Sequence, residues 1–224
     1  MKKEQIQQKI NELQSLLNEG TRTEYNIILD RSGSMQSIKS DMEGGFKTWI
    51  ENEKKLEGVA TVNLYQFDDK FETVYEGRNL DNADLILVPR GGTALNDGIG
   101  KTIGIVKDRH KNSKPDRTIF VIITDGEENS SREWTSSSVK NLVEQETKQN
   151  NWVFLYIGAN QDAVLTGKDR GINVGKALNY ASTPEGTNDM WKSVSKGTSK
   201  LRCASNVSYS NMAQDKEEVF NSEN

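Results

Sequence analysis

The chain has 224 residues, of which 33% are hydrophobic and 28% charged, and its net charge at pH 7 is −4. This length fits one α/β domain with short extensions. Acidic and basic residues are interspersed, which argues against a nucleic-acid partner, because a nucleic-acid-binding surface needs Lys and Arg clustered on one face. The single cysteine, Cys203, excludes an internal disulfide and a cysteine-based zinc site. The single histidine, His110, excludes most histidine-based catalysis and metal binding.

Neither a signal peptide nor a membrane span is visible in the sequence. The first residues, MKKEQIQQKINELQ, carry two lysines but no apolar core like that of a signal peptide. No apolar run approaches the length needed to cross a bilayer. We therefore expect a soluble, cytoplasmic protein with no membrane partner, and one cysteine is compatible with a reducing compartment.

Residues 1–20 are predicted to form an amphipathic helix in front of the main domain. Four apolar residues recur there at alternating spacings of four and three: Ile6, Ile10, Leu13 and Leu17. This is an a/d stripe, but it covers only about two and a half heptads, fewer than a coiled coil requires. We favour packing of this helix against its own domain, and homodimerisation through it is the alternative.

The domain itself is expected over residues 21–202 and begins with alternating β and α patterns. The patterns predict a strand over 24–30, a helix over about 36–56, and a hairpin of strands over 59–67 and 70–77 joined by Asp68-Asp69. One face of the helix carries Met42, Phe46, Trp49 and Ile50. Gly44-Gly45 interrupts it, which indicates close packing or a kink.

The second half of the domain continues the alternation. A glycine-rich loop at 91–92 opens a helix from about Ala94, and further segments are a strand within 117–129, a helix near 133–149, a strand over 151–160, a helix near 161–169 and a strand near 172–179. A closing helix is predicted with Thr183 as its N-cap and Pro184 at its first position. The last segment, 203–224, is polar and expected to be flexible.

These elements predict a doubly wound α/β fold. Nearly continuous apolar runs are typical of parallel strands covered by helices on both faces. The hairpin adds one antiparallel edge strand to this mostly parallel sheet.

Three polar loops follow strands in this pattern: Asp30-x-Ser32-x-Ser34, Gly91-Gly92-Thr93 and Thr124-Asp125-Gly126. In a parallel α/β sheet, ligands bind outside the carboxyl ends of the strands, where the strand order switches. If the first and fourth strands are neighbours, the three loops converge. All of their side-chain ligands are then oxygen atoms.

Oxygen ligands without His or Cys suit a hard cation such as Mg²⁺, with Mn²⁺ or Ca²⁺ as possible substitutes. Ser32, Ser34 and Thr93 would supply neutral oxygens. Asp30 and Asp125 would supply charge, either directly or by holding bound waters. Neutral hydroxyls compensate the ion's charge incompletely, so a carboxylate from a partner protein would be attracted to an open coordination position.

The same residues resemble a known motif. Asp30-Arg31-Ser32-Gly33-Ser34, Thr93 in GGTALND and Asp125 in ITDGEEN together resemble the metal-ion-dependent adhesion site of von Willebrand factor type A domains, over roughly residues 22–180. The resemblance implies a Rossmann-like fold and a metal-dependent protein-binding module. It further implies direct metal binding by Ser32 and Ser34, direct binding by Thr93 in the ligand-occupied state, and action through water by Asp30 and Asp125.

Two other stretches, ITDGEENSS (123–131) and YIGANQDAVLTGKDRGI (156–172), resemble bacterial and phage members of this family more than animal adhesion domains. The general family pattern has no counterpart of the helix expected over residues 1–20. The resemblance therefore assigns no role to that helix.

Several of these residues also have a simpler interpretation. Asp30-x-Ser32-x-Ser34 alone is typical of a capped turn before a helix. Asp68, Asp69 and Asp97 are expected on the hairpin turn and helix surface. For Asp97, which lies one helical turn past Thr93, an indirect role beside the metal site is the alternative. His110, in the charged helix end KDRHK, is expected to be solvated.

The alternative function is that of a metal-dependent hydrolase acting on phosphate esters at the same site. It would use Asp30 as nucleophile or base. Phosphatases of that kind usually carry a second carboxylate two residues after the first, and Ser32 occupies that position. No other obvious base is available, so we favour a protein that is not an enzyme.

Overall fold

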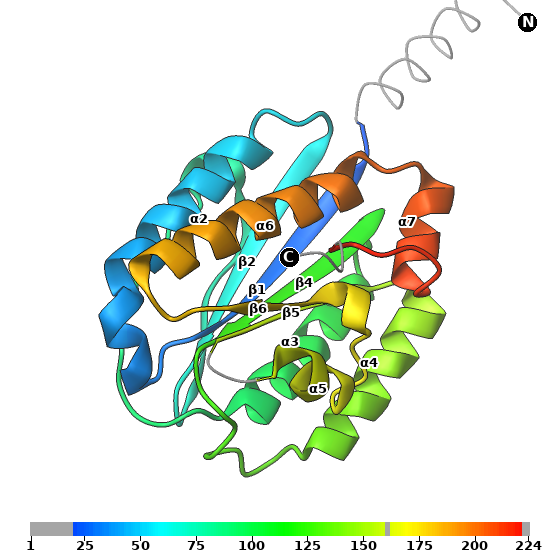
Figure 1. Ribbon diagram of the computed structural model, residues 1–224. Helices are drawn as coiled ribbons and strands as arrows, with labels where there is room; N and C mark the ends of the chain where they lie inside the picture. The colour runs from blue at the N-terminus through cyan, green and yellow to red at the C-terminus, as the bar shows by residue number, and fades with distance from the viewer. Residues whose placement is uncertain (1–19, 160–161, 221–224) are drawn as a thin grey trace, which may run out of the picture.

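A six-stranded sheet forms the centre of the molecule (Figure 1). The computed structural model describes residues 20–159 and 162–220. The strands are β1 Arg22–Asp30, β2 Val59–Phe67, β3 Phe71–Asn79, β4 Arg117–Thr124, β5 Val153–Ala159 and β6 Ala177–Tyr180. Their order is β3-β2-β1-β4-β5-β6, and every neighbouring pair is parallel except β2 and β3. The predicted doubly wound fold with one antiparallel edge strand is confirmed.

Helices cover both faces of this sheet (Figure 1). They are α2 Lys39–Glu53, α3 Leu95–His110, α4 Ser136–Asn150, α5 Ala163–Lys168, α6 Pro184–Cys203 and α7 Asn206–Ala213. Short 3₁₀ helices span η1 Gly33–Ile38, η2 Leu80–Asn82 and η3 Val174–Lys176. The side chains of α2 and α6 belong to one buried apolar cluster, and those of α3, α4 and α5 to another. Every residue of β4 and β5 is buried, because alternate side chains enter the two clusters.

The glycine pair in α2 serves close packing. A β-carbon placed on Gly45 would lie 1.9 Å from the Trp191 ring of α6, whereas one on Gly44 would meet nothing within 4 Å. The predicted inward face of α2 is confirmed, since Met42, Phe46, Trp49 and Ile50 are all buried. The predicted cap of α6 is also confirmed, because the Thr183 side chain accepts a hydrogen bond from the Gly186 amide.

The prediction of a flexible tail over 203–224 is wrong for residues 203–220. α7 buries Tyr209 and Met212 in the core. Beyond it, the amides of Val219 and Phe220 donate to the Gly175 carbonyl at 3.0 and 2.9 Å. Most of the few apolar residues of this segment are therefore used in packing, with Val207 (72% exposed) as an exception, and the polar average composition conceals this. The folded domain extends past the predicted boundary at residue 202.

The structure corrects two other predictions, the extent of the strand near 172–179 and the exposure of His110. The strand expected near 172–179 is limited to β6, because the Asn173 side chain caps η3. His110 is not solvated, since its side chain is 7% exposed and its Nε2 atom lies 3.1 Å from Glu24 Oε1. Burial alone would raise the pKa of Glu24, but hydrogen bonds from His110 and Arg109 outweigh burial and lower it to about 2.

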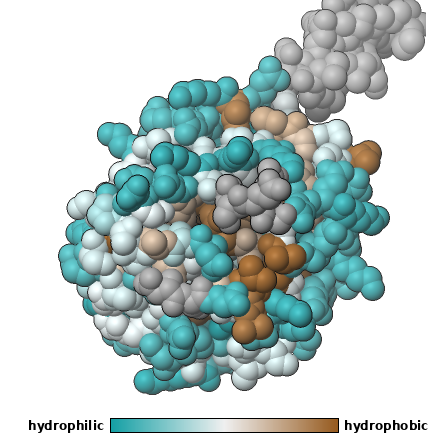
Figure 2. Space-filling view, viewed as in Figure 1, coloured by the Kyte–Doolittle hydropathy of each residue, from teal (hydrophilic) through white to brown (hydrophobic). Residues whose placement is uncertain are grey.

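The surface is largely polar. Figure 2 shows a mostly hydrophilic face with an apolar patch over α5 and the segment before β6, where Leu165 and Val174 are both 55% exposed. Within the described residues, no helix has the length and apolar character of a membrane span. The predicted helix over residues 1–20, and with it the homodimer prediction, falls outside the described residues except for Gly20.

Candidate metal site

The ends of β1 and β4 bring two of the predicted loops together. The two strands are parallel neighbours in which Leu29 pairs with Ile123, so Asp30 lies level with Thr124. Thr124 Oγ1 donates to Asp30 Oδ2 at 2.6 Å, and the amide of Ser32 donates to Asp30 Oδ1 at 2.6 Å. Both oxygens of this fully buried carboxylate are thus held in place.

The serine pair links the first loop to Asp125. Ser32 Oγ lies 3.0 Å from Ser34 Oγ, and Ser34 Oγ donates to Asp125 Oδ1 at 2.6 Å. Ser34 is exposed, whereas Ser32 and Asp125 are buried. The cluster is therefore open to solvent on the Ser34 side.

The loop before α3 supplies the third component. The amide of Gly33 donates to the Gly91 carbonyl at 3.2 Å, which joins this loop to the first one. A β-carbon on Gly126 would lie 3.0 Å from Thr93 Oγ1, 3.8 Å from Ser34 Oγ and 3.9 Å from Asp30 Oδ2. Side-chain oxygens of the first loop and of the loop before α3 thus surround one small volume beside Gly126 of the third loop. Any side chain at position 126 would intrude on it.

Burial perturbs both carboxylates of the cluster. It raises the pKa of Asp30 to about 6, although hydrogen bonds from Thr124 and Ser32 act in the opposite direction. Burial also raises the pKa of Asp125, against its hydrogen bond from Ser34. Ionised carboxylates held this way gain from a nearby cation, and an all-oxygen donor set suits a hard one. No group of three or more His, Cys, Asp or Glu side chains able to hold a metal occurs in the described parts of the chain, so an ion here would depend on hydroxyls and water.

All five predicted residues, Asp30, Ser32, Ser34, Thr93 and Asp125, therefore meet at one edge of the sheet. Their role as metal ligands is a prediction. Several supporting residues were not predicted from the sequence. Thr124 holds Asp30, and Asn129 holds Thr93, accepting from its amide at 2.9 Å and donating to its carbonyl at 3.0 Å.

Asp97 was expected on the helix surface, and this is wrong. It is 7% exposed and accepts hydrogen bonds from three consecutive amides, those of Arg132, Glu133 and Trp134, at 3.0, 3.0 and 2.8 Å. The carboxylate therefore fixes the loop that carries Asp125 and Asn129. The signal in the sequence was the position of Asp97 one helical turn past Thr93, which left an indirect role beside the site as the alternative.

Asp68 was also expected at the surface but is fully buried, whereas Asp69 is exposed as predicted. Asp68 Oδ2 lies 2.8 Å from Arg31 Nε and 2.9 Å from Arg90 Nε. This pair of arginines connects the hairpin turn to the first loop and to the loop before α3. Asp68 thus stabilises the positions of two metal-site loops.

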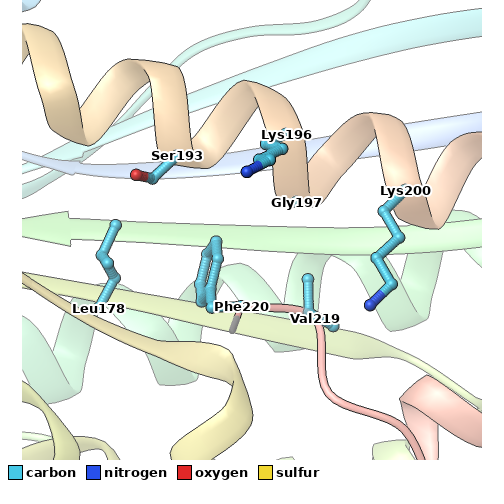
Figure 3. Close-up of a pocket in the computed structure, with 7 residues that line it drawn as sticks. All are labelled: Leu178, Ser193, Lys196, Gly197, Lys200, Val219 and Phe220. Atoms are coloured by element: carbon cyan, nitrogen blue, oxygen red, sulfur yellow. The ribbon is translucent and has the colours of Figure 1, made fainter. Parts of the chain in front are cut away.

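A separate cavity of about 220 Å³ lies between α6 and the segment at Val219 and Phe220 (Figure 3). Leu178 and these two side chains form its apolar wall, and Lys196 and Lys200 stand on α6. None of the five predicted site residues lines it. The cavity is thus not part of the predicted metal site.

The sheet order, the antiparallel edge strand and the helices on both faces define the fold of a von Willebrand factor A domain. No family model and no curated protein matches the sequence. The mussel byssus proximal thread matrix protein 1, in a structure with a zinc-occupied MIDAS motif, aligns with a TM-score of 0.61 and 12% identity over 81% of this chain and 47% of that one. This chain thus spans about half the length of that protein.

Two other solved structures are similar to this fold. The vWF domain of the type V pili tip protein Mfa5 from Porphyromonas gingivalis aligns with a TM-score of 0.61 and 10% identity, over 83% of this chain and 98% of that one. The ArnB paralog VWA2 from Sulfolobus acidocaldarius aligns with a TM-score of 0.51 and 17% identity, over 80% and 45%. At these identities the similarity establishes the fold alone.

Proposed function

We propose that this chain is a metal-dependent protein-binding module, in which Mg²⁺ at the adhesion-type site captures a Glu or Asp side chain of a partner protein. The observation that carries this proposal is the convergence of Asp30, Ser34 and Thr93 oxygens around the volume that a β-carbon on Gly126 would occupy. The zinc-occupied motif of the mussel protein, which shares the fold, supports a divalent ion as the ligand of such a site.

Some residues of the site would bind the ion directly and others through water, according to their positions. Ser32 and Ser34, which lie 3.0 Å apart, would bind the ion directly, and Thr93 would do so when a partner is bound. Asp30 and Asp125 would act through water, because their oxygens already accept hydrogen bonds from neighbouring groups. The ion would supply positive charge and an open position for a carboxylate oxygen.

The charges in the groove beside the site are mixed. A groove next to Thr93, with a volume of about 430 Å³, is lined in part by Lys70, Lys101 and Arg132. Glu133 on its rim pairs with Lys101 at 2.8 Å. Lys70 and Arg132 are exposed and have no carboxylate within ion-pair distance among residues 20–159 and 162–220. Asp69 and Asp97 also line the groove, so its formal charges balance, and the preference for an acidic side chain rests on the ion rather than on this groove.

Binding is favoured over phosphate-ester hydrolysis. Both oxygens of Asp30 are engaged by Ser32 and Thr124, so this carboxylate is poorly placed to attack a substrate. The only histidine of the sequence, His110, is bonded to Glu24 near the other end of β1. Neither residue thus supplies a general base at the site. The cytoplasmic location and the homodimer remain predictions from the sequence.

The proposal is tested with a random-peptide display library presented to the immobilised protein in Mg²⁺ or in EDTA. We expect the selected peptides to share a Glu or Asp, and their binding to be lost in EDTA and in Asp30→Ala. Asp108→Ala, at an exposed position on α3, is the control and should bind like the wild type. Binding that is equal in EDTA would contradict the proposal. Turnover of p-nitrophenyl phosphate that is lost in Asp30→Ala would instead favour the hydrolase.

A further inference from the structure

One buried hydroxyl near the site has no partner. Tyr180 is the last residue of β6 and is 9% exposed. Its hydroxyl oxygen is inaccessible to solvent and makes no hydrogen bond within the described residues. Buried hydroxyls in native proteins nearly always have a partner, which can be a water molecule or an ion's hydration shell. The Tyr180 hydroxyl, at the carboxyl end of β6, is thus available to a partner that binds at this edge of the sheet.

The strand register places Tyr180 level with Asp125. Thr124 pairs with Gly158 of β5, and Gly158 pairs with Asn179 of β6. Asp125 follows Thr124 and Tyr180 follows Asn179, so both lie one position beyond this row of paired residues. Two strand spacings separate them, which is about 10 Å between α-carbons.

The residue between these two positions is small. Ala159 pairs with Tyr180 and stands on the strand between it and Asp125. Side chains alternate between the faces of a sheet, and Ile123, two residues before Asp125, lies in the same buried cluster as Ala159 and Tyr180. The three positions therefore share a face. Because Ala159 is small, the phenol ring can extend across it towards Asp125.

The electrostatics agree with this placement. Burial raises the pKa of Tyr180, and the negative charges of Asp125 and Asp30 raise it further. The hydroxyl therefore lies within the field of both site carboxylates. It also keeps its proton at physiological pH, so it is available as a hydrogen-bond donor.

We propose that Tyr180 is a positioning residue of the metal site, whose hydroxyl donates a hydrogen bond to a water molecule that Asp125 holds in the ion's coordination shell. This inference rests on the proposed metal site. We infer a bridging water because the register places Tyr180 level with Asp125 on one face of the sheet, whereas no direct hydrogen bond joins the hydroxyl to the carboxylate. Tyr180 would thereby orient the water and raise the affinity of the site for the ion.

The test compares Tyr180→Phe with the wild type by calorimetric titration of Mg²⁺ and of Mn²⁺ alone. Loss of an outer hydrogen bond should raise the Kd about tenfold. In EDTA, the unfolding midpoint of the variant should be equal to or above that of the wild type, because the lost hydroxyl had no protein partner. With Mn²⁺, water-proton relaxation should also change, because the bound water loses its anchor.

Thr23→Val is the matched control. Thr23 is 2% exposed, its hydroxyl is also without a hydrogen bond, and it lies at the opposite end of β1 from Asp30. This variant should keep the wild-type Kd. A Kd of Tyr180→Phe equal to that of the wild type, or a rise in Kd accompanied by lost stability in EDTA, would overturn the role of Tyr180. If the wild type binds neither ion, the proposed function fails together with it.

Discussion

Asp97 provides the sharpest test of how the loop after β4 is held. The substitution Asp97→Asn preserves the shape of the side chain but replaces one acceptor oxygen with an amide donor. In the native protein, Oδ1 accepts from the amides of Glu133 and Trp134, and Oδ2 accepts from that of Arg132. An asparagine side chain keeps only one acceptor oxygen, so it can accept either from the amides of Glu133 and Trp134 or from that of Arg132. Its NH₂ group must then face a backbone N–H group.

The cost follows from this geometry. A hydrogen bond to a charged group contributes about 1.5–3 kcal/mol, and a buried donor without an acceptor costs about 1–3 kcal/mol. We therefore expect Asp97→Asn to lower the free energy of unfolding by about 2–5 kcal/mol, a large part of the ~5–15 kcal/mol typical of a domain. Because the same loop carries Asn129, which holds Thr93, the affinity for Mg²⁺ should fall as well.

Urea unfolding in EDTA measures the stability, with the midpoint expected to fall and the slope to remain constant. Titration calorimetry measures Mg²⁺ binding. Asp108→Asn is the control, because Asp108 lies on the same helix but is exposed and paired only with Lys111. Its effect should be small. If Asp97→Asn unfolds at the wild-type urea concentration, or if the two variants lose equal stability, the assigned role of Asp97 is wrong.

Three further predictions concern charge and packing. In EDTA, the ion-free wild type should lose stability as the pH rises from 3.8 to about 6, because the raised pKa of Asp30 makes the folded state bind more protons than the unfolded state in that window. Unlike the backbone amides on Asp97, the Thr124 hydroxyl can turn to donate to the Gly126 carbonyl and accept from the new amide; Asp30→Asn should therefore be more stable at pH 7 by up to about 3 kcal/mol, and lower stability would contradict this. For Glu24 the pH dependence of stability has the opposite sign. Its depressed pKa contributes stability that is present above pH 4.5 and is lost as the pH falls towards about 2, and acid titration of Glu24→Gln should lack this loss. Gly45→Ala should destabilise the fold by about 1–3 kcal/mol through its clash with Trp191, whereas Gly44→Ala should stabilise it by about 0.5–1 kcal/mol in the same urea assay.

Most of the fold could be predicted because local signals agreed with the tertiary structure. β4 and β5 are apolar along their entire length, as strands buried on both faces must be. The hairpin of β2 and β3 carried its own turn signal, and α6 carried its own cap. In each case the predictive pattern lay within a few consecutive residues.

The predicted site residues also carried local signals, since each follows the end of a strand or opens a helix. The residues that were missed act across the sheet instead. The role of Asp97 depends on a loop about 35 positions later in the chain, and Tyr180 is brought near Asp125 only by the pairing of β4, β5 and β6. Such contacts depend on register, which no local pattern in this sequence revealed.

Three buried groups at the carboxyl edge of the sheet share one physical property. Asp30 and Asp125 are buried carboxylates with raised pKa values, and the Tyr180 hydroxyl is buried without a partner. Each of these groups lowers the stability of the ion-free fold, and each would gain a partner when an ion and its waters bind. Replacement of any one by its uncharged or apolar analogue should therefore stabilise the protein in EDTA and reduce the stabilisation that Mg²⁺ provides. Three unrelated substitutions that shift both quantities in this way would be difficult to explain without a common ligand, whereas a variant that gains stability in EDTA and keeps the full response to Mg²⁺ would exclude that residue from the site.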